Sequence, residues 1–179
     1  MKVNFVFGLI LLGFVACTNE GSNKEAIRSE SELLALIKGW SNSDSLRNPG
    51  VMQKYTLALD EFLDNYPDNP EHENFLFLAA NNLVNLRDYE GAAAKFARYS
   101  EKYPDSRSHA ESLIAAGFLY NNEIHNLDSA RKYYETFVIT YPDHMYTEDI
   151  KSELQNLGKT PEEMLDAITE GQDSTDHRP

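Results

Sequence analysis

The sequence predicts an all-α protein in which antiparallel helix pairs stack into a solenoid of about eight helices. The first observation behind this prediction is the tripeptide Tyr-Pro-Asp, which occurs at residues 66–68, 103–105 and 141–143. The three prolines are 37 and 38 residues apart, and a fixed spacing of this size is typical of helical repeat arrays. Each proline ends a helix, because its ring and its missing N–H force the preceding tyrosine out of helical geometry. The second observation is that no stretch of the chain has the alternating pattern of a strand.

Two helices are expected before the first of these prolines. Apolar residues recur at helical spacing in residues 33–40 and predict the first helix, whereas the polar residues 41–48 predict a loop. Asn48-Pro49-Gly50 is typical of a turn into the next helix, since proline is tolerated at the first helical position. This second helix carries one apolar face and ends at Tyr66.

Two further helix pairs are expected between the first and the third proline. The first pair is predicted at residues 70–83 and 89–102, with Asn69 as the cap of its first helix. The second pair is predicted at residues 108–120 and 127–141. Its start has Ser108 and Glu111 at the spacing of a capping box, in which each side chain would accept a backbone N–H of the other residue.

The last pair of helices is shorter than the others. One helix is expected at residues 147–157, where Gly158 ends it. Thr160-Pro161-Glu162-Glu163 is a start signal for an eighth helix over residues 161–168. The polar residues 171–179 are expected to be a disordered tail.

Composition and charge restrict the classes of partner. The net charge is −13, and an acidic surface repels nucleic acid and anionic lipid, so no nucleic-acid partner is expected. Cys17 is the only cysteine, so no disulfide can form within the chain.

The first seventeen residues have the pattern of a bacterial lipoprotein signal. Lys2 supplies a positive charge, residues 3–14 form a short apolar run, and Phe14-Val15-Ala16-Cys17 resembles the lipobox. The resemblance implies a signal peptide at residues 1–16, lipidation of Cys17 and a flexible tether at residues 17–24. Thr18, in place of an aspartate, resembles lipoproteins of the outer membrane, here expected to face the periplasm. The alternative is an uncleaved anchor or an ordinary signal peptide with an unmodified cysteine.

Two segments share one pattern of small and large apolar residues. The first consists of Leu76, Ala79, Ala80, Leu83, Ala92, Phe96, Tyr99 and Pro104, and the second of Leu113, Ala116, Gly117, Tyr120, Ala130, Tyr134, Phe137 and Pro142. Both resemble the tetratricopeptide repeat (TPR) consensus, in which small residues let helices approach and large ones fill the gap. The resemblance implies a right-handed TPR-like solenoid over residues 25–170. It has two clear repeats at 69–104 and 106–142, a degenerate repeat before them and a capping helix pair after them.

The repeat spacing and the Tyr-Pro-Asp ends resemble the TPR lipoproteins of the barrel-assembly machinery and of the Tol-Pal coordinator. Residues 154–163 resemble the corresponding part of uncharacterised TPR lipoproteins of Bacteroidetes. These resemblances imply an adaptor or scaffold of the cell envelope that uses no cofactor and no small-molecule substrate.

In the TPR register, the first helix of each pair lines a concave surface. Its expected residues are Asn74, Phe77, Asn81, Val84, Asn85, Glu111, Ile114, Phe118, Asn121 and Asn122. Asparagine amides both donate and accept hydrogen bonds, which suits an extended peptide backbone, while the phenylalanines and Ile114 offer apolar pockets. The alternative is that these side chains are only solvated, or that Phe77 and Phe118 pack within the chain. These positions contain no cluster of lysine and arginine, so the carboxylate clamp of chaperone-binding TPR proteins is not expected.

The histidines and carboxylates predict neither a metal site nor a catalytic site. His72 and His109 each follow a proline by five residues, so both are expected at the surface, at the starts of stacked helices. Helices pack roughly 8–10 Å apart, which is wide for two ligands of one ion. Asp60, Glu61 and Asp64 are expected on a solvated helix face. No nucleophile with a base and no phosphate loop is evident, so an enzyme is not expected.

Two other functions stay open at this stage. One is a small envelope hydrolase or metal-dependent enzyme whose site is built from scattered residues. The other is a structural subunit of a larger assembly that uses the convex face or the region of Trp40.

The register predicts that Leu113 is a core residue. We expect Leu113→Ala to lower the free energy of unfolding by roughly 2–5 kcal/mol, because the substitution removes buried methyl groups and leaves a cavity. Urea denaturation followed by circular dichroism measures this loss. An unchanged unfolding midpoint would show that the predicted register is wrong.

Overall fold

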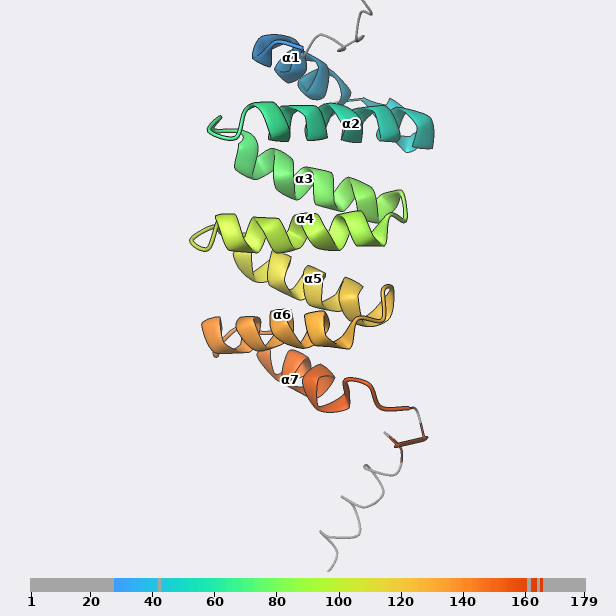
Figure 1. The fold of residues 1–179 in the computed structure, drawn as a ribbon, viewed down its shortest axis with the longest axis vertical. Coiled ribbons are helices and arrows are strands. Elements are labelled where there is room, and N and C mark those ends of the chain that lie inside the picture. The colour runs from blue at the N-terminus through green and yellow to red at the C-terminus, as the bar shows by residue number, and fades with distance from the viewer. Residues whose placement is uncertain (1–27, 42, 161, 164, 166–179) are drawn as a thin grey trace, which may run out of the picture.

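The computed structural model describes residues 28–41, 43–160, 162, 163 and 165 as a column of stacked helices (Figure 1). The elements in chain order are α1 (Glu30–Ser41), the 3-10 helix η1 (Asp44–Arg47), α2 (Pro49–Asn65), α3 (His72–Asn85), α4 (Tyr89–Lys102), α5 (His109–Asn122), α6 (Leu127–Thr140) and α7 (Thr147–Asn156). Successive α-helices run in opposite directions, and each packs chiefly on the helices before and after it in the chain. The three Tyr-Pro-Asp turns lie on one side of the column, on the left in Figure 1.

This arrangement confirms the all-α, TPR-like solenoid. The described part of the chain contains no strand and seven α-helices. The eighth predicted helix falls mostly outside the described residues, although its start signal is present. The Thr160 N–H donates to Glu163 Oε2 at 2.8 Å, and the Glu163 N–H donates to Thr160 Oγ1 at 3.2 Å. The predicted signal peptide, Cys17, the tether and the tail at 171–179 all lie outside the described residues.

The predicted loop at residues 41–48 is wrong in part, because it contains η1. The Ser43 side chain accepts the Ser45 N–H at 3.1 Å and starts this short helix. Asn48 then caps α2 as the sequence indicates, since its side chain accepts the N–H groups of Gly50 and Val51.

Two predicted helix starts also differ from the structure. Helix α3 begins at His72 rather than at Pro70, because Asn69 Oδ1 accepts the Glu71 N–H at 2.8 Å and prolongs the preceding turn. The predicted capping box at Ser108 is wrong, since that side chain forms no capping hydrogen bond. Instead, the Ser108 N–H donates to Ser106 Oγ at 3.1 Å.

The core follows the predicted apolar stripes in two adjoining clusters. One cluster joins α1, α2, α3 and α4 through Leu33, Ile37, Tyr55, Ala58, Leu59, Phe62, Leu63, Phe75, Leu76, Ala79 and Tyr99. The other joins α3 to α7 through Ala80, Leu83, Ala92, Ala93, Phe96, Ala97, Leu113, Ala116, Leu119, Tyr133, Tyr134, Phe137 and Ile150. Leu113 is fully covered within it, which confirms the register.

Helices α5 and α6 approach each other closely at Gly117. A Cβ atom on this residue would lie 2.4 Å from Cδ1 and 2.5 Å from Cε1 of Tyr134, which belongs to the facing helix α6. The tyrosine is itself buried, so its ring has no empty space to move into. A small residue at this repeat position is therefore a steric requirement of the α5–α6 contact.

We expect Gly117→Ala to destabilise the protein by about 1–3 kcal/mol, because the new methyl group overpacks the core against Tyr134. Gly39→Ala is the matched control, since Gly39 lies inside α1 and a Cβ there would have no neighbour within 4 Å. This control is expected to gain roughly 0.5–1 kcal/mol from helix propensity alone. Thermal and urea unfolding of both variants measure the difference, and equal behaviour of the two would contradict the close contact.

Candidate peptide-binding groove

The ten predicted groove residues lie on the accessible sides of α3 and α5. Five of them are exposed, namely Asn74, Asn85, Glu111, Phe118 and Asn122, and the other five are half-buried, namely Phe77, Asn81, Val84, Ile114 and Asn121. None is fully buried, so all ten are sterically available to a ligand. Whether a partner binds them stays a prediction.

The apolar members of this set differ in how far they are engaged within the chain. The Phe77 ring packs edge-on against Phe96 and Tyr99, with ring centroids 5.5 and 5.2 Å apart. Val84 and Ile114 also pack against the core. Phe118 differs, because 51% of its surface is exposed. It is therefore the main apolar side chain that this face offers to a ligand.

Two asparagines are held by their own helices. The Asn81 Nδ2 donates to the carbonyl of Phe77 at 2.9 Å, and the Asn122 Nδ2 donates to the carbonyl of Phe118 at 3.1 Å. Each bond uses one of the two amide hydrogens and fixes the orientation of the side chain. A fixed amide loses little conformational entropy when it binds a peptide backbone.

A hollow of about 480 Å³ lies at the N-terminal end of this face, and we name it the loop hollow. Its lining residues are Pro70, Glu73, Asn74, Phe77, Tyr99, Asp105, Ser106, Arg107 and Ser108. Only Asn74 and Phe77 were predicted, and the rest of the lining comes from the start of α3 and the turn before it, from α4, and from residues 105–108 between α4 and α5. Its only sequence signal is that residues 105–108 repeat the position of residues 68–71 after a proline.

Tyr99 fixes the shape of the loop hollow. Its hydroxyl lies 3.0 Å from Glu73 Oε1 and 2.6 Å from Ser106 Oγ, and so joins α3 to the turn between α4 and α5. Burial raises the pKa of this phenol, and the Glu73 carboxylate raises it further, so the hydroxyl keeps its proton at neutral pH.

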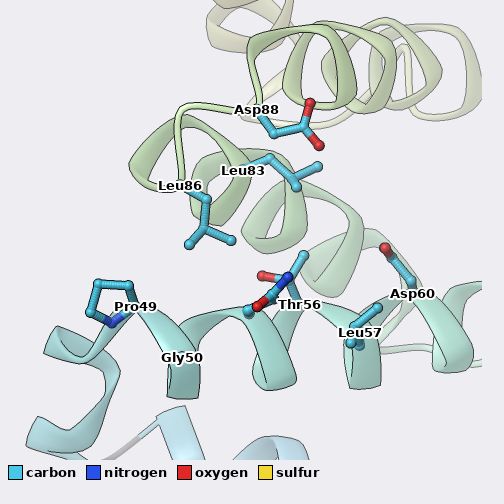
Figure 2. Close-up of a pocket in the computed structure, with 9 residues that line it drawn as sticks. Pro49, Gly50, Thr56, Leu57, Asp60, Leu83, Leu86 and Asp88 are labelled. Carbon is cyan, nitrogen blue, oxygen red and sulfur yellow. The ribbon is translucent and has the colours of Figure 1, made fainter.

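A second hollow of about 470 Å³, the α2 hollow, is lined by Pro49, Gly50, Gln53, Thr56, Leu57, Asp60, Leu83, Leu86 and Asp88. Figure 2 shows Leu83 and Leu86 on the opposite side of the opening from α2, with Asp88 farther from α2. None of the ten predicted residues lines it. In the repeat register Leu83 occupies the position of Tyr120, whose ring stacks on Tyr133 one repeat later.

The prediction that His72 and His109 lie at the surface is wrong. Only 1% of His72 and 6% of His109 is exposed. The Nδ1 atom of His72 lies 2.6 Å from the Tyr103 hydroxyl, and that of His109 lies 2.7 Å from the Tyr141 hydroxyl. Each histidine starts the first helix of a pair and is covered by the tyrosine that ends the second helix. The hydroxyl satisfies a ring nitrogen that burial removes from water.

Within the described residues, His72 and His109 belong to no cluster of metal-binding side chains. Among residues 28–41, 43–160, 162, 163 and 165, no group of three or more histidine, cysteine or carboxylate side chains could hold an ion. All three carboxylates predicted on a solvated face have an ion-pair partner: Asp60 lies 2.6 Å from Lys95, Asp64 lies 4.0 Å from Arg98, and Glu61 pairs with Arg28. These pairs join α2 to α4 and to Arg28, which precedes α1. No helix in the described part of the chain is long and apolar enough to cross a membrane.

The comparison with known families agrees with this geometry. The family model of the tetratricopeptide repeat matches residues 75–106, which cover most of α3, all of α4 and the start of the next turn. A search of curated proteins finds no match to the chain. Residues 75–106 therefore match a tetratricopeptide repeat, and this segment contains four of the nine residues that line the loop hollow, namely Phe77, Tyr99, Asp105 and Ser106.

Burial of the two histidines predicts that acid destabilises the fold. Burial lowers the pKa of both imidazoles, and Lys102 lowers that of His72 further. Unfolded histidine titrates near pH 6.5, so the unfolded chain binds protons that the folded chain resists, and stability is lost as the pH falls below that value. We expect the unfolding midpoint in urea to fall between pH 7.5 and pH 5.5. This fall in the urea midpoint should be smaller in a His72→Gln/His109→Gln variant, whereas the control His125→Gln, which changes an exposed histidine, should behave like the wild type. An equal fall in the wild type, the double variant and the control would contradict the prediction.

Proposed function

We propose that this chain is a lipid-anchored adaptor or scaffold of the cell envelope that binds another envelope protein through the α3–α5 face. TPR repeats generally mediate binding to proteins or peptides, and the repeat match covers four of the ten residues of this face, all on α3. The observation that carries the proposal is the row of accessible asparagines beside the exposed Phe118. Oriented amides and one apolar anchor are what an extended peptide needs for backbone hydrogen bonds and a side-chain pocket.

The anchor part of the proposal rests on the sequence around Cys17. Diacylglyceryl and amino-terminal acyl chains together would supply the two or more chains that stable membrane attachment requires. Attachment at an outer membrane, facing the periplasm, would raise the effective concentration of the adaptor near envelope partners. Outer-membrane protein assembly and envelope maintenance are the processes in which such a protein would act.

One observation favours a second candidate, a structural subunit that uses another face. Leu57 is 60% exposed at the rim of the α2 hollow, beside Leu83 and Leu86. An exposed leucine beside two further leucines would suit contact with a neighbouring subunit. An envelope hydrolase or metal-dependent enzyme stays the third candidate, and no geometry of the described residues specifically favours it.

Capture of partners from membranes tests the binding face. Full-length protein is crosslinked in membranes and purified, in parallel with an Asn81→Ala/Phe118→Ala variant and a Leu57→Ala control. We expect the double variant to lose at least about tenfold of the partner, because an aromatic anchor often dominates binding energy, while its helicity and the capture by Leu57→Ala stay unchanged. Loss of the partner only in Leu57→Ala would move the interface to the α2 hollow.

The anchor is tested with Cys17→Ser and with a globomycin-type block of lipoprotein processing. The wild-type protein is expected in the membrane fraction with acyl groups on Cys17 by mass spectrometry, and the variant is expected to lose these groups. Wild-type protein without acyl groups would contradict the anchor.

Turnover of an envelope substrate by the purified protein, with no captured partner, would favour the enzyme candidate.

A further inference from the structure

The loop hollow combines an apolar floor with two carboxylates. Pro70, Phe77 and Tyr99 provide the apolar surface, while Glu73 and Asp105 line the same space. Its volume of about 480 Å³ lies within the range of small-ligand pockets, and is ample for one long side chain.

The two carboxylates are not neutralised by the chain itself, as far as the structure describes it. Several other acidic side chains are paired, for example Asp60 with Lys95 at 2.6 Å and Glu101 with Lys132 at 3.3 Å. Within the described residues, neither Glu73 nor Asp105 lies within 4.0 Å of a lysine or arginine nitrogen. Glu111 adds a further exposed acid on the adjoining part of the face.

Two features of the hollow would favour an anion instead. Arg107 lines it, and α3 and α5 both begin beside it, where helix dipoles favour negative charge. However, the first N–H groups of α5 are engaged: the Ser108 N–H donates to Ser106 Oγ, and the His109 N–H donates to the Ser106 carbonyl at 3.2 Å. Two carboxylates against one guanidinium leave the hollow with net negative charge.

We propose that the loop hollow binds a lysine or arginine side chain of the peptide segment that occupies the α3–α5 face. The aliphatic stem lies along Pro70 and the ring of Phe77, and the cationic head meets Glu73 and Asp105. The preferred partner is therefore an extended segment with a basic residue followed, toward Phe118, by an apolar one. This inference rests on the proposed function, since it identifies the chemistry of the ligand at that same face.

The test uses small probes that need no known partner. N-acetylarginine amide is titrated into the full-length, ¹⁵N-labelled protein in detergent micelles, beside N-acetylcitrulline amide as its uncharged analogue. We expect saturable shifts of the amides of Asn74, Phe77 and Ser106 with the arginine probe only. Glu73→Gln and Asp105→Asn should each weaken binding by about three- to tenfold, whereas Arg107→Ala should strengthen it.

Controls separate this site from bulk charge. Glu135→Gln makes the same change of net charge on the exposed surface of α6 and should leave the affinity unchanged. Equal shifts with the citrulline probe, no shift with either probe, or binding of N-acetylglutamate amide that depends on Arg107 would each overturn the proposal. The cation site and the adaptor function can fail separately. If Asn81→Ala/Phe118→Ala abolishes partner capture while Glu73→Gln and Asp105→Asn leave it intact, the cation site is contradicted and the adaptor function is supported.

Discussion

The tyrosine at the end of each second helix ties every helix pair to its own beginning. The Tyr103 hydroxyl meets His72, the Tyr141 hydroxyl meets His109, and the Tyr66 hydroxyl donates to the carbonyl of Arg28 at 2.8 Å. In all three cases the partner lies at or just before the start of the first helix of the pair. Each tyrosine ring also packs on the aromatic ring four residues before it. The tyrosine thus joins the end of the second helix of each pair to the start of the first, and the proline after it ends the second helix next to this contact.

This closure determines what the stack presents to a ligand. A tyrosine fixes the start of α3 and another fixes the start of α5. Equivalent residues of the two helices therefore lie at the same level along the accessible face. Asn74 and Glu111 occupy one level of the repeat, and Asn81 and Phe118 another. The loop hollow forms where the turn after α4 meets α3, so it also depends on the turn geometry that follows each proline.

Much of the fold was readable from the sequence, because proline spacing and small residues act locally. The positions of the helices, the buried Leu113 and the glycine against Tyr134 all follow from the repeat pattern. The errors have two causes: contacts between residues more than thirty positions apart, and local choices between neighbouring side chains in the turns. His72 was placed at the surface because nothing near it in the sequence indicates that Tyr103 covers it. The predicted capping box at Ser108 does not form, because Ser106 Oγ and not the Glu111 side chain accepts the Ser108 N–H, a choice decided by the turn and not by residue type.

The candidate site was predictable only in part for the same reason. Helical periodicity places Asn74 and Phe77 on the accessible side of α3, but the hollow beside them needs Tyr99 and Asp105 from other elements. The α2 hollow was not predicted either, because its walls come from α2 and from the end of α3 with the turn after it, which are far apart in the sequence.

Neighbour-only packing has a mechanical consequence. A force applied between the two ends of such a column passes through every helix junction in series, so the weakest junction yields first. The terminal helices α1 and α7 each bury only two residues, whereas α2 to α6 bury four to seven. Under load the column would therefore unravel from its ends, and α3 to α6, with the face between them, would be the last part to open.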